Sequence, residues 1–504
     1  MTLLVVLYVA TALWLSLYGF NALGLFLIAV WRGHPRPESP PVPDRWPHVT
    51  VQLPVYNEIH VVERLLRGVA RLDYPRERLE IQVLDDSDDE TSWVIARIVG
   101  ELRGRGVPIE HVRRPRREGY KAGALAYGLA RARGEYIAIL DADFVPPRDW
   151  LRPTLPYLIA DPTLAFVQTR WEHLNAFASP FTLAQSLALD GHFGVEQPAR
   201  EALGWPLAFN GSAGIWRKQA IVDSGNWQAD TLCEDLDLSY RAQMRGWRGR
   251  ILPHIAVPGE IPPLVIAFRR QQARWATGSI QTFRKLARDL VRASALSPSA
   301  RVEGLLHQTS YLVHPLMLLL VLLTWPLLLW HPQVNFPLAY VGLAGLGPPA
   351  IYALAQWRLR RSLRRLWAFP LIMCLGLGIA WHSTRAVARG LVGWGRAFER
   401  TPKFRLVGRA NAWQGKRYST GYREIPWGEG MLAAYTFAGA LWAATHGHLS
   451  VAPFLLLYAV SFALVGGTMM WEQVGALRAQ RRRPYRRERR LVRVALKPKE
   501  ENPG

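Results

Sequence analysis

The first half of the chain alternates short apolar runs with stretches whose apolar residues recur at helical spacing. The apolar runs predict strands at Val49–Leu53, Ile81–Leu84, Ile109–Val112, Tyr136–Leu140 and Leu164–Gln168. The amphipathic stretches predict helices near Ile59–Arg71, Thr91–Arg103, Gly123–Arg133 and Arg148–Ile159. Because strand–helix units repeat, we expect an α/β fold with a mostly parallel sheet covered on both faces. Ligands bind such sheets beyond the carboxyl ends of the strands.

Longer apolar runs predict membrane segments. Leu3–Val30 is nearly all apolar and long enough for a retained anchor. Two hairpins are predicted from the remaining long runs, which are Leu306–Trp330 with Phe336–Trp357 and Gly430–Thr445 with Ser450–Met470. Trp367–Trp381 has about half the usual spanning length, and a basic loop follows it, so we predict a re-entrant or interfacial segment there. The sequence thus predicts five spans.

The positive charge lies beside these apolar runs. The net charge is +23, and Arg and Lys cluster at Arg358–Arg365, Arg396–Arg409 and Arg478–Arg493. This is the positive-inside pattern of cytoplasmic membrane loops, and it argues against nucleic-acid binding. We therefore expect a multi-pass protein of the cell membrane (inner or plasma membrane), in contact with lipid, with its α/β domain in the cytoplasm. Its two cysteines provide neither a disulfide framework nor a zinc site.

These patterns divide the chain into five parts. Residues 1–33 form the predicted N-terminal transmembrane anchor, and residues 34–263 form the α/β domain after a proline-rich linker. Residues 264–300 are predicted to form an interfacial amphipathic helix. Residues 301–475 hold the remaining membrane helices with basic cytoplasmic loops, and residues 476–504 form a basic cytoplasmic tail.

Acidic residues follow the predicted strands. Asp85 and Asp86 come after the second strand, and Asp141 and Asp143 come after the fourth. Such residues commonly cap helices, but two clusters at the carboxyl edge of one sheet favour a ligand site. Asp141-Ala142-Asp143 suits a hard cation, Mg²⁺ or Mn²⁺, that keeps its other positions for water and phosphate.

A third acidic cluster, Glu234 and Asp235, opens a predicted helix. A carboxylate beside a metal site can serve as a general base. Lys121 lies in a glycine-containing turn before another helix, where it is either a phosphate contact or a solvated lysine.

One face of a later helix carries Gln271, Arg274 and Trp275, at positions i, i+3 and i+4. An amide, a fixed cation and a flat ring suit an anionic leaving group next to a sugar. The alternative is an interfacial helix with its Trp at the lipid headgroups.

Together these motifs resemble the membrane-integrated family 2 glycosyltransferases of the cellulose synthase-like superfamily. The resemblance runs from about Val49 to Phe404 and includes Leu53-Pro54-Val55-Tyr56-Asn57-Glu58, Lys121-Ala122-Gly123-Ala124 and Cys233-Glu234-Asp235, with Cys233 where Thr is usual. Three further segments, Gln168–Asn175, Phe209–Arg217 and Glu399–Phe404, look most similar to plant-type mannan and glucomannan synthases and related β-glucan synthases.

The resemblance implies a GT-A domain, with a Rossmann-like sheet, joined to an α-helical transmembrane region. It implies that Asp235 is the general base, with Glu234 beside it in the catalytic pair. It further implies donor contacts from Asp85, Asp86, Lys121, Asp141, Gln271 and Arg274, metal ligation by Asp141 and Asp143, with Asp143 the more direct ligand, and acceptor contact from Trp275. Trp171 and Trp216 are weaker candidates for stacking on the acceptor, while His173 and His192 are predicted to be structural.

We therefore expect an inverting hexosyltransferase that extends a β-linked polysaccharide, of the β-1,4-mannan, glucomannan or β-glucan type. Its donor would be GDP-mannose, GDP-glucose or UDP-glucose, and an export partner is left open. The alternative is a non-processive transferase that makes a glycolipid on ceramide, diacylglycerol or polyprenyl phosphate. A non-enzymatic scaffold or channel would not need three acidic motifs in this order.

Overall fold

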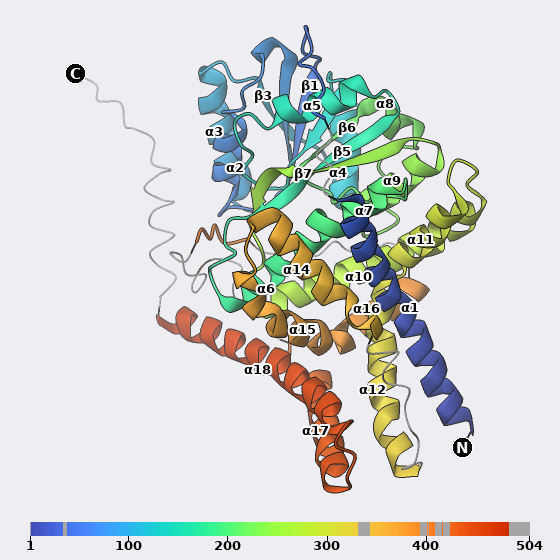
Figure 1. Cartoon of the computed structure of the whole chain (residues 1–504). Helices are drawn as coiled ribbons and strands as arrows, with labels where there is room; N and C mark the ends of the chain where they lie inside the picture. The colour runs from blue at the N-terminus through green and yellow to red at the C-terminus, as the bar shows by residue number, and fades with distance from the viewer. Residues whose placement is uncertain are drawn as a thin grey trace.

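The computed structural model describes residues 2–33, 38–330, 343–393, 401, 403–408, 416 and 424–482. Figure 1 shows an α/β domain at the top and long helices that extend away from it at the bottom. The N-terminal helix α1 (Thr2–Arg32) reaches from the lower end up to the side of the α/β domain. Two architectures are therefore joined in one molecule.

The α/β domain holds a seven-stranded sheet with the order β3-β2-β1-β4-β6-β5-β7. The strands are β1 (Val49–Val55), β2 (Leu79–Asp85), β3 (Ile109–Arg113), β4 (Tyr136–Ile139), β5 (Leu164–His173), β6 (Gly214–Arg217) and β7 (Arg248–Gly259). The β1–β2, β1–β4, β2–β3 and β5–β7 pairs are parallel, whereas β6 runs antiparallel to both neighbours. All five predicted strands exist, and the expected mostly parallel sheet is confirmed.

Helices cover both faces of the sheet, as its alternating side chains require. On β4, Ala138 points into one core with Leu65 and Ile98, whereas Ile137 points into the other with Leu129. Burying each large apolar side chain stabilises the fold by about 1.5–3 kcal/mol. The helices of this domain are α2 (Val62–Val69), α3 (Thr91–Gly104), α4 (Tyr120–Leu129), α5 (Leu151–Ala160), α8 (Lys218–Asp223) and α9 (Glu234–Met244).

A second group of helices links the sheet to the apolar helices. It comprises α6 (Pro180–Gly191), a π-helical turn (His192–Glu196), α7 (Gln197–Ala202), α10 (Val265–Arg292) and α11 (Pro298–Gln308). The predicted interfacial segment thus contains one long helix, α10, that runs beneath the carboxyl edge of the sheet (Figure 1).

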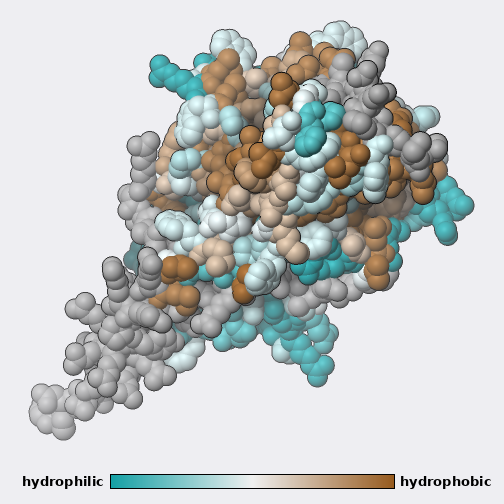
Figure 2. Space-filling view, turned by 90° about the horizontal axis from the view of Figure 1, so that it is seen from below, coloured by the Kyte–Doolittle hydropathy of each residue, from teal (hydrophilic) through white to brown (hydrophobic). Residues whose placement is uncertain are grey.

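Three helices in the described part of the chain are long and apolar enough to cross a membrane: Leu3–Arg32, Ser310–Trp330 and Ala452–Leu477. The other helices of this region are α14 (Gly347–Arg360), α15 (Phe369–Gly378), α16 (Ala380–Val392) and α17 (Trp427–Thr445), while α12 (Val313–Trp330) and α18 (Ala452–Arg482) carry two of the three candidates. Figure 2, which views the molecule from below, shows apolar residues scattered over much of this face among more polar ones. These features support membrane association.

The five predicted spans are only partly reproduced. The predicted segment 336–357 lies partly outside the described residues, and α17 is not among the long apolar helices. Where a re-entrant segment was predicted, α15 and α16 meet at a 48° bend and could together form one broken span. The predicted tail lies mostly outside the described residues.

Candidate active site

A cavity of about 710 Å³ opens at the carboxyl edge of the sheet and continues between α1, α12, α14 and α15. Every predicted site residue lines it except Asp85 and the weaker candidate Trp216. The residues that line its far end include Tyr18 and Asn21 of α1, Tyr311 and His314 near α12, and Tyr352 of α14. The cavity therefore joins the acidic motifs to the apolar helices.

The two aspartates after β2 have different environments. Asp85 is buried, and its carboxylate accepts hydrogen bonds from Ser87 N at 2.9 Å and from Ser92, and pairs with His111 Nε2 at 2.8 Å. Burial favours a raised pKa for Asp85, but these hydrogen bonds outweigh it and the pKa is lowered. Asp85 therefore stabilises the end of the strand β2 through these hydrogen bonds and does not line the cavity.

Asp86 does face the cavity, and it is neutralised by an arginine. Arg114 donates to both carboxylate oxygens of Asp86, at 2.7 and 2.6 Å. This bidentate pair fixes the orientation of the carboxylate. Asp86 is thus a firmly held polar group on the wall that lies near β1 and β2.

Lys121 lies at the centre of the acidic groups. Its ammonium lies 2.7 Å from Asp141 Oδ1 and 3.9 Å from Glu234 Oε1, and donates to the carbonyl oxygen of Gly211 at 2.9 Å. Burial opposes the charge on Lys121, but the nearby carboxylates outweigh it and raise the pKa of this lysine. The lysine is therefore held as a cation.

Gly211 brings the backbone against the general-base candidate. Its φ of +77° favours glycine, and a Cβ there would lie 2.6 Å from Asp235 Oδ2. Any larger residue would push Asp235 away, so this glycine is required by the close approach. The same segment then enters β6 at Gly214.

Glu234 and Asp235 share a buried, negatively charged environment at the start of α9. Burial, followed by the charge of Asp235, raises the pKa of Glu234 to about 7, although Lys121 and Arg274 oppose the rise. Burial likewise raises the pKa of Asp235, against the opposing charges of Lys121 and Arg274. A carboxyl group with a raised pKa is a stronger base than an ordinary one, which suits proton abstraction.

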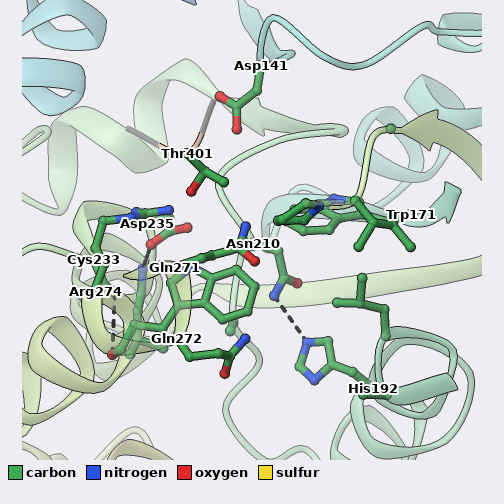
Figure 3. Close-up of a pocket in the computed structure, with 18 of the residues that line it drawn as sticks. Asp141, Trp171, His192, Asn210, Cys233, Asp235, Gln271, Gln272, Arg274 and Thr401 are labelled. Carbon is green, nitrogen blue, oxygen red and sulfur yellow. Dashed lines mark hydrogen bonds between the residues drawn. The ribbon is translucent and has the colours of Figure 1, made fainter. Parts of the chain in front are cut away.

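Helix α10 carries Gln271, Arg274 and Trp275 to the same cavity. Gly278, one turn further on, allows close packing, since a Cβ there would lie 2.8 Å from the backbone nitrogen of Cys233. The Cys233 thiol in turn lies 3.9 Å from the carbonyl oxygen of Trp275. In Figure 3, Arg274 and Asp235 lie on the same side of the pocket.

The two ends of α10 are held by different parts of the molecule. Glu472 of α18 accepts hydrogen bonds from the backbone nitrogens of Val265 and Ile266, at 2.7 and 3.2 Å. Lys285 pairs with Asp237 of α9 at 2.9 Å. The helix therefore has a fixed position relative to both the α/β domain and the last long helix.

One cation of the site was missed by the sequence analysis. Lys403 donates to Asp143 Oδ2 and to the carbonyl oxygen of Glu260, both at 2.8 Å. The Glu260 carboxylate accepts hydrogen bonds from the backbone nitrogens of Phe404 and Leu406, at 2.8 and 3.1 Å. The segment Glu399–Phe404 had been noted for its resemblance to the family, which was the only signal for this contact.

The two tryptophans predicted as weaker acceptor contacts, Trp171 and Trp216, lie in different environments. Trp171 lines the cavity, whereas Trp216 is fully buried in a core cluster, so its predicted acceptor role is wrong. His173 and His192 were predicted to be structural, but both line the cavity. His192 contacts Glu196 and Asn210, at 3.2 and 3.1 Å.

Comparison with known families gives two matches. Residues 50–192 match glycosyl transferase family 2, and residues 136–466, more than half of the chain, match glycosyl transferase family group 2. Among solved structures, a mannosyltransferase from Pyrobaculum calidifontis in complex with GDP-Man and Mn²⁺ aligns with a TM-score of 0.52 at 23% identity, over 77% of this chain and 99% of that chain. With the sheet described above, this likeness confirms the expected GT-A fold.

Curated relatives from plants share more sequence. The chain is 34% identical to glucomannan 4-beta-mannosyltransferase 1 of Oryza sativa subsp. japonica, over 71% of each protein. It is 35% identical to glucomannan 4-beta-mannosyltransferase 2 of Arabidopsis thaliana, over 70% of this chain and 66% of that protein. A probable glucomannan 4-beta-mannosyltransferase 6 of the same rice is 41% identical over 50% of this chain, which is 45% of that protein. The chain thus spans 45% to 71% of the lengths of these relatives, and it belongs to the family 2 glycosyltransferases.

Proposed function

We propose that this protein is an inverting hexosyltransferase that extends a β-1,4-linked mannan or glucomannan from a GDP-sugar. One observation carries the proposal: Asp235, Lys121 and Arg274 line a single cavity that continues from the sheet into the apolar helices. The similarity to plant glucomannan 4-beta-mannosyltransferases supports the choice of mannosyl transfer. The runner-up is a transferase that glycosylates a lipid, since the cavity also borders apolar helices.

The acidic pair Asp141 and Asp143 fits a divalent cation. Both carboxylates line the cavity, and each already pairs with an ammonium group, from Lys121 or Lys403 at 2.7 or 2.8 Å. The described residues contain no group of three or more His, Cys, Asp or Glu suited to a metal. Two carboxylates are nevertheless enough for Mg²⁺ or Mn²⁺ when water and diphosphate supply the other ligands. When bound, such an ion would neutralise negative charge on the departing diphosphate.

The side chains of this protein then have separate roles in the reaction. Lys121 and Arg274 bind the diphosphate, and Gln271 orients it. Asp235 takes the proton of an acceptor hydroxyl, whose oxygen attacks the anomeric carbon from the face opposite the leaving group. One such displacement inverts the configuration, so an α-linked nucleotide sugar gives a β-linkage. Glu234, with its raised pKa, lies beside the base as the second member of the catalytic pair.

Asp86 is proposed to contact the nucleoside of the donor, since it lies on the cavity wall near β1 and β2. Asp85 is proposed to act through Asp86, because its own carboxylate is already hydrogen-bonded. Trp275 is proposed to stack on the acceptor sugar. The positive-inside pattern supports a cytoplasmic position of the basic loops, and we propose that the α/β domain faces the same side of a cell membrane.

Product analysis tests the proposal. Membranes that contain the full chain would receive GDP-mannose, GDP-glucose or UDP-glucose with Mn²⁺, and radiolabelled product would be separated by solvent extraction and size. We expect a long polymer that a β-mannanase degrades, from GDP-mannose above all. Label confined to organic-soluble lipid would contradict the polymer and favour the runner-up.

A single variant tests the assignment of Asp235 as the general base. Asp235→Asn keeps the shape of the side chain but removes the base, so we expect kcat to fall by about 10³-fold. Binding of GDP should change little, because the amide remains in the same place. Full turnover by Asp235→Asn would contradict the assignment of Asp235.

A further inference from the structure

A second cavity of the α/β domain, of about 280 Å³, shares no lining residue with the catalytic one. One glutamate, Gly68, Val145, Pro146 and five arginines line it, and the arginines are Arg64, Arg67, Arg71, Arg148 and Arg405. Figure 1 shows α2, which supplies the first two, at the left of the α/β domain, whereas α9 lies at the right. We call this space the arginine cavity. Gathering like charges costs free energy, which a bound anion would offset.

The spacing of three of these arginines puts them on one face of α2 and its continuation. Arg64, Arg67 and Arg71 stand at positions i, i+3 and i+7. Gly68, one turn after Arg64, has no side chain to fill the space between them. A Cβ at this glycine would already meet Val145 Cγ1 at 3.6 Å. The glycine therefore leaves room between α2 and the segment that follows β4.

Stabilisation of a helix end explains only part of this cluster. Arginines near the end of a helix bind its last carbonyl groups, and Arg71 does so, because its Nε donates to the carbonyl oxygen of Arg67 at 3.0 Å. Arg148 lies between β4 and α5, and Arg405 lies between α16 and α17. These two arginines belong to neither end of α2. Three segments that are far apart in the sequence therefore converge on one cavity.

The carboxylates around the arginine cavity do not balance its charge. Arg67 pairs with two carboxylates and Arg64 with one, at 2.9 to 3.1 Å. These carboxylates are those of Glu63, Glu101 and Glu260. In the part of the chain that the structure describes, no carboxylate pairs with Arg71 or Arg148. Three carboxylates thus pair within a group of five arginines, and the cavity keeps an excess of positive charge.

Arg64 is held in place and still has donors to offer. Its Nη2 donates to the carbonyl oxygen of Asp143 at 3.2 Å and to Glu260 Oε2 at 3.1 Å. Its Nε and Nη1 are buried and have no hydrogen-bond partner among the described residues. A buried donor without a partner costs about 1–3 kcal/mol. Arg64 lines the arginine cavity and not the catalytic one, so an acceptor bound there would supply the missing partner.

A phosphate group is the anion that suits this cavity. Guanidinium groups present paired N–H donors that match the oxygens of phosphate. The described lining residues include no aromatic side chain, so a base or a sugar ring would lack a stacking partner. The volume of about 280 Å³ also lies just below the range of about 300–1,000 Å³ that is usual for drug-sized ligands. The space therefore suits a phosphate with at most a small substituent.

We propose that the arginine cavity is a second anion site, which binds a phosphate group through Arg64, Arg71 and Arg148. Free inorganic phosphate and the phosphate of a lipid headgroup present the same chemistry to these side chains. The site is separate from the residues that we propose for the donor diphosphate. It does not depend on which sugar the protein transfers.

Calorimetry with inorganic phosphate tests the site. The purified full chain, in nanodiscs of phosphatidylcholine, would be titrated at about 0.15 M NaCl, where charges are screened over about 8 Å. Saturating GDP would occupy the donor contacts throughout. Arg71→Gln and Arg148→Gln, both at exposed positions, should each raise the Kd for phosphate about tenfold. Arg245→Gln removes an exposed arginine just after α9 that lines neither cavity, so this matched control should equal wild type.

A charge-preserving variant separates phosphate recognition from attraction by net charge. Arg148→Lys keeps the charge but loses the paired donors, so its Kd should lie between those of wild type and Arg148→Gln. Equal phosphate affinity in wild type, Arg71→Gln and Arg148→Gln, an equal loss in Arg245→Gln, or no binding of phosphate to wild type would overturn the inference. These titrations involve no turnover, so a failure to make polymer would contradict the proposed function and leave the anion site standing.

A change of lipid identifies the source of the phosphate. Nanodiscs that contain phosphatidic acid offer a headgroup phosphate in addition to the titrated ion. If the wild type then no longer binds inorganic phosphate, the site is occupied by lipid. If the titration is unchanged, the site takes free phosphate. Either result supports the site, provided that Arg71→Gln and Arg148→Gln weaken the binding of phosphate in phosphatidylcholine alone.

Discussion

Two lysines neutralise the two aspartates of the Asp141-Ala142-Asp143 segment, and they differ in what else they hold. Lys121 belongs to the first turn of α4 and also contacts Glu234 and Gly211. Lys403 comes from a segment between α16 and α17, and its two hydrogen bonds go to Asp143 and the Glu260 carbonyl. In the proposed mechanism Lys121 therefore belongs to the catalytic site, whereas Lys403 holds the place that a cation bound at Asp143 would take.

The difference follows from where each lysine stands in the fold. The left-handed residues Gly119 and Tyr120, with φ of 67° and 49°, lead directly into α4, so the position of Lys121 is set by the α/β domain. Lys403 depends instead on Glu260, which binds the backbone of Phe404 and Leu406. Glu260 itself pairs with Arg64 at 3.1 Å. A long-range contact thus brings the second lysine to the site.

Of the two lysines, Lys121 is expected to give the larger effect when it is replaced. Lys121→Met leaves Asp141, Glu234 and Asp235 without their shared cation and removes a contact to diphosphate. We expect kcat to fall by about 10²–10³-fold, as for loss of other preorganised charges in active sites. Steady-state kinetics with GDP-mannose measures this fall in kcat. A loss below about tenfold would mean that Lys121 is only a structural cation.

The sequence predicted the strands and acidic motifs well, because both leave local patterns. Alternating apolar runs defined β1 to β5, and Asp141 and Asp143 follow β4 directly. β6 was missed because four residues are too short to show a period, and β7 because its first residues are polar and bulges interrupt its pairing with β5. Lys403 was missed because only tertiary contacts, to Asp143 and to the Glu260 carbonyl, bring it to the site.

Replacing Lys403 is expected to have a smaller effect, which is a gain in Mn²⁺ affinity rather than a loss of kcat. Lys403→Met removes the cation that competes for Asp143, so the free protein should bind Mn²⁺ about tenfold more tightly, equivalent to about 1.4 kcal/mol. Electron paramagnetic resonance of free Mn²⁺ measures this without turnover. The matched control is Lys416→Met, because Lys416 donates to the Phe404 carbonyl and does not contact Asp143 in the described residues. Unchanged or weaker Mn²⁺ binding would show that Asp143 is not a ligand.

The smallest expected effect is a shift in the pH dependence of kcat when Lys121 is replaced. Burial raises the pKa of Glu234 to about 7 and raises that of Asp235, and Lys121 limits both rises. Because the base must be deprotonated, kcat should increase as pH rises toward neutrality in the wild type. Without Lys121 the carboxyl groups hold their protons to higher pH, so the rising limb of kcat in Lys121→Met should move up by about one pH unit.

Lys403 provides the matched comparison for this shift, since in the described residues it contacts Asp143 but neither Glu234 nor Asp235. The rising limb for Lys403→Met should therefore coincide with that of wild type when each profile is normalised to its own maximum. Equal shifts in both variants would mean that the two lysines act through the summed charge of the cavity. A shift in Lys121→Met alone would place the titrating group beside α4, where Glu234 lies 3.9 Å from the ammonium.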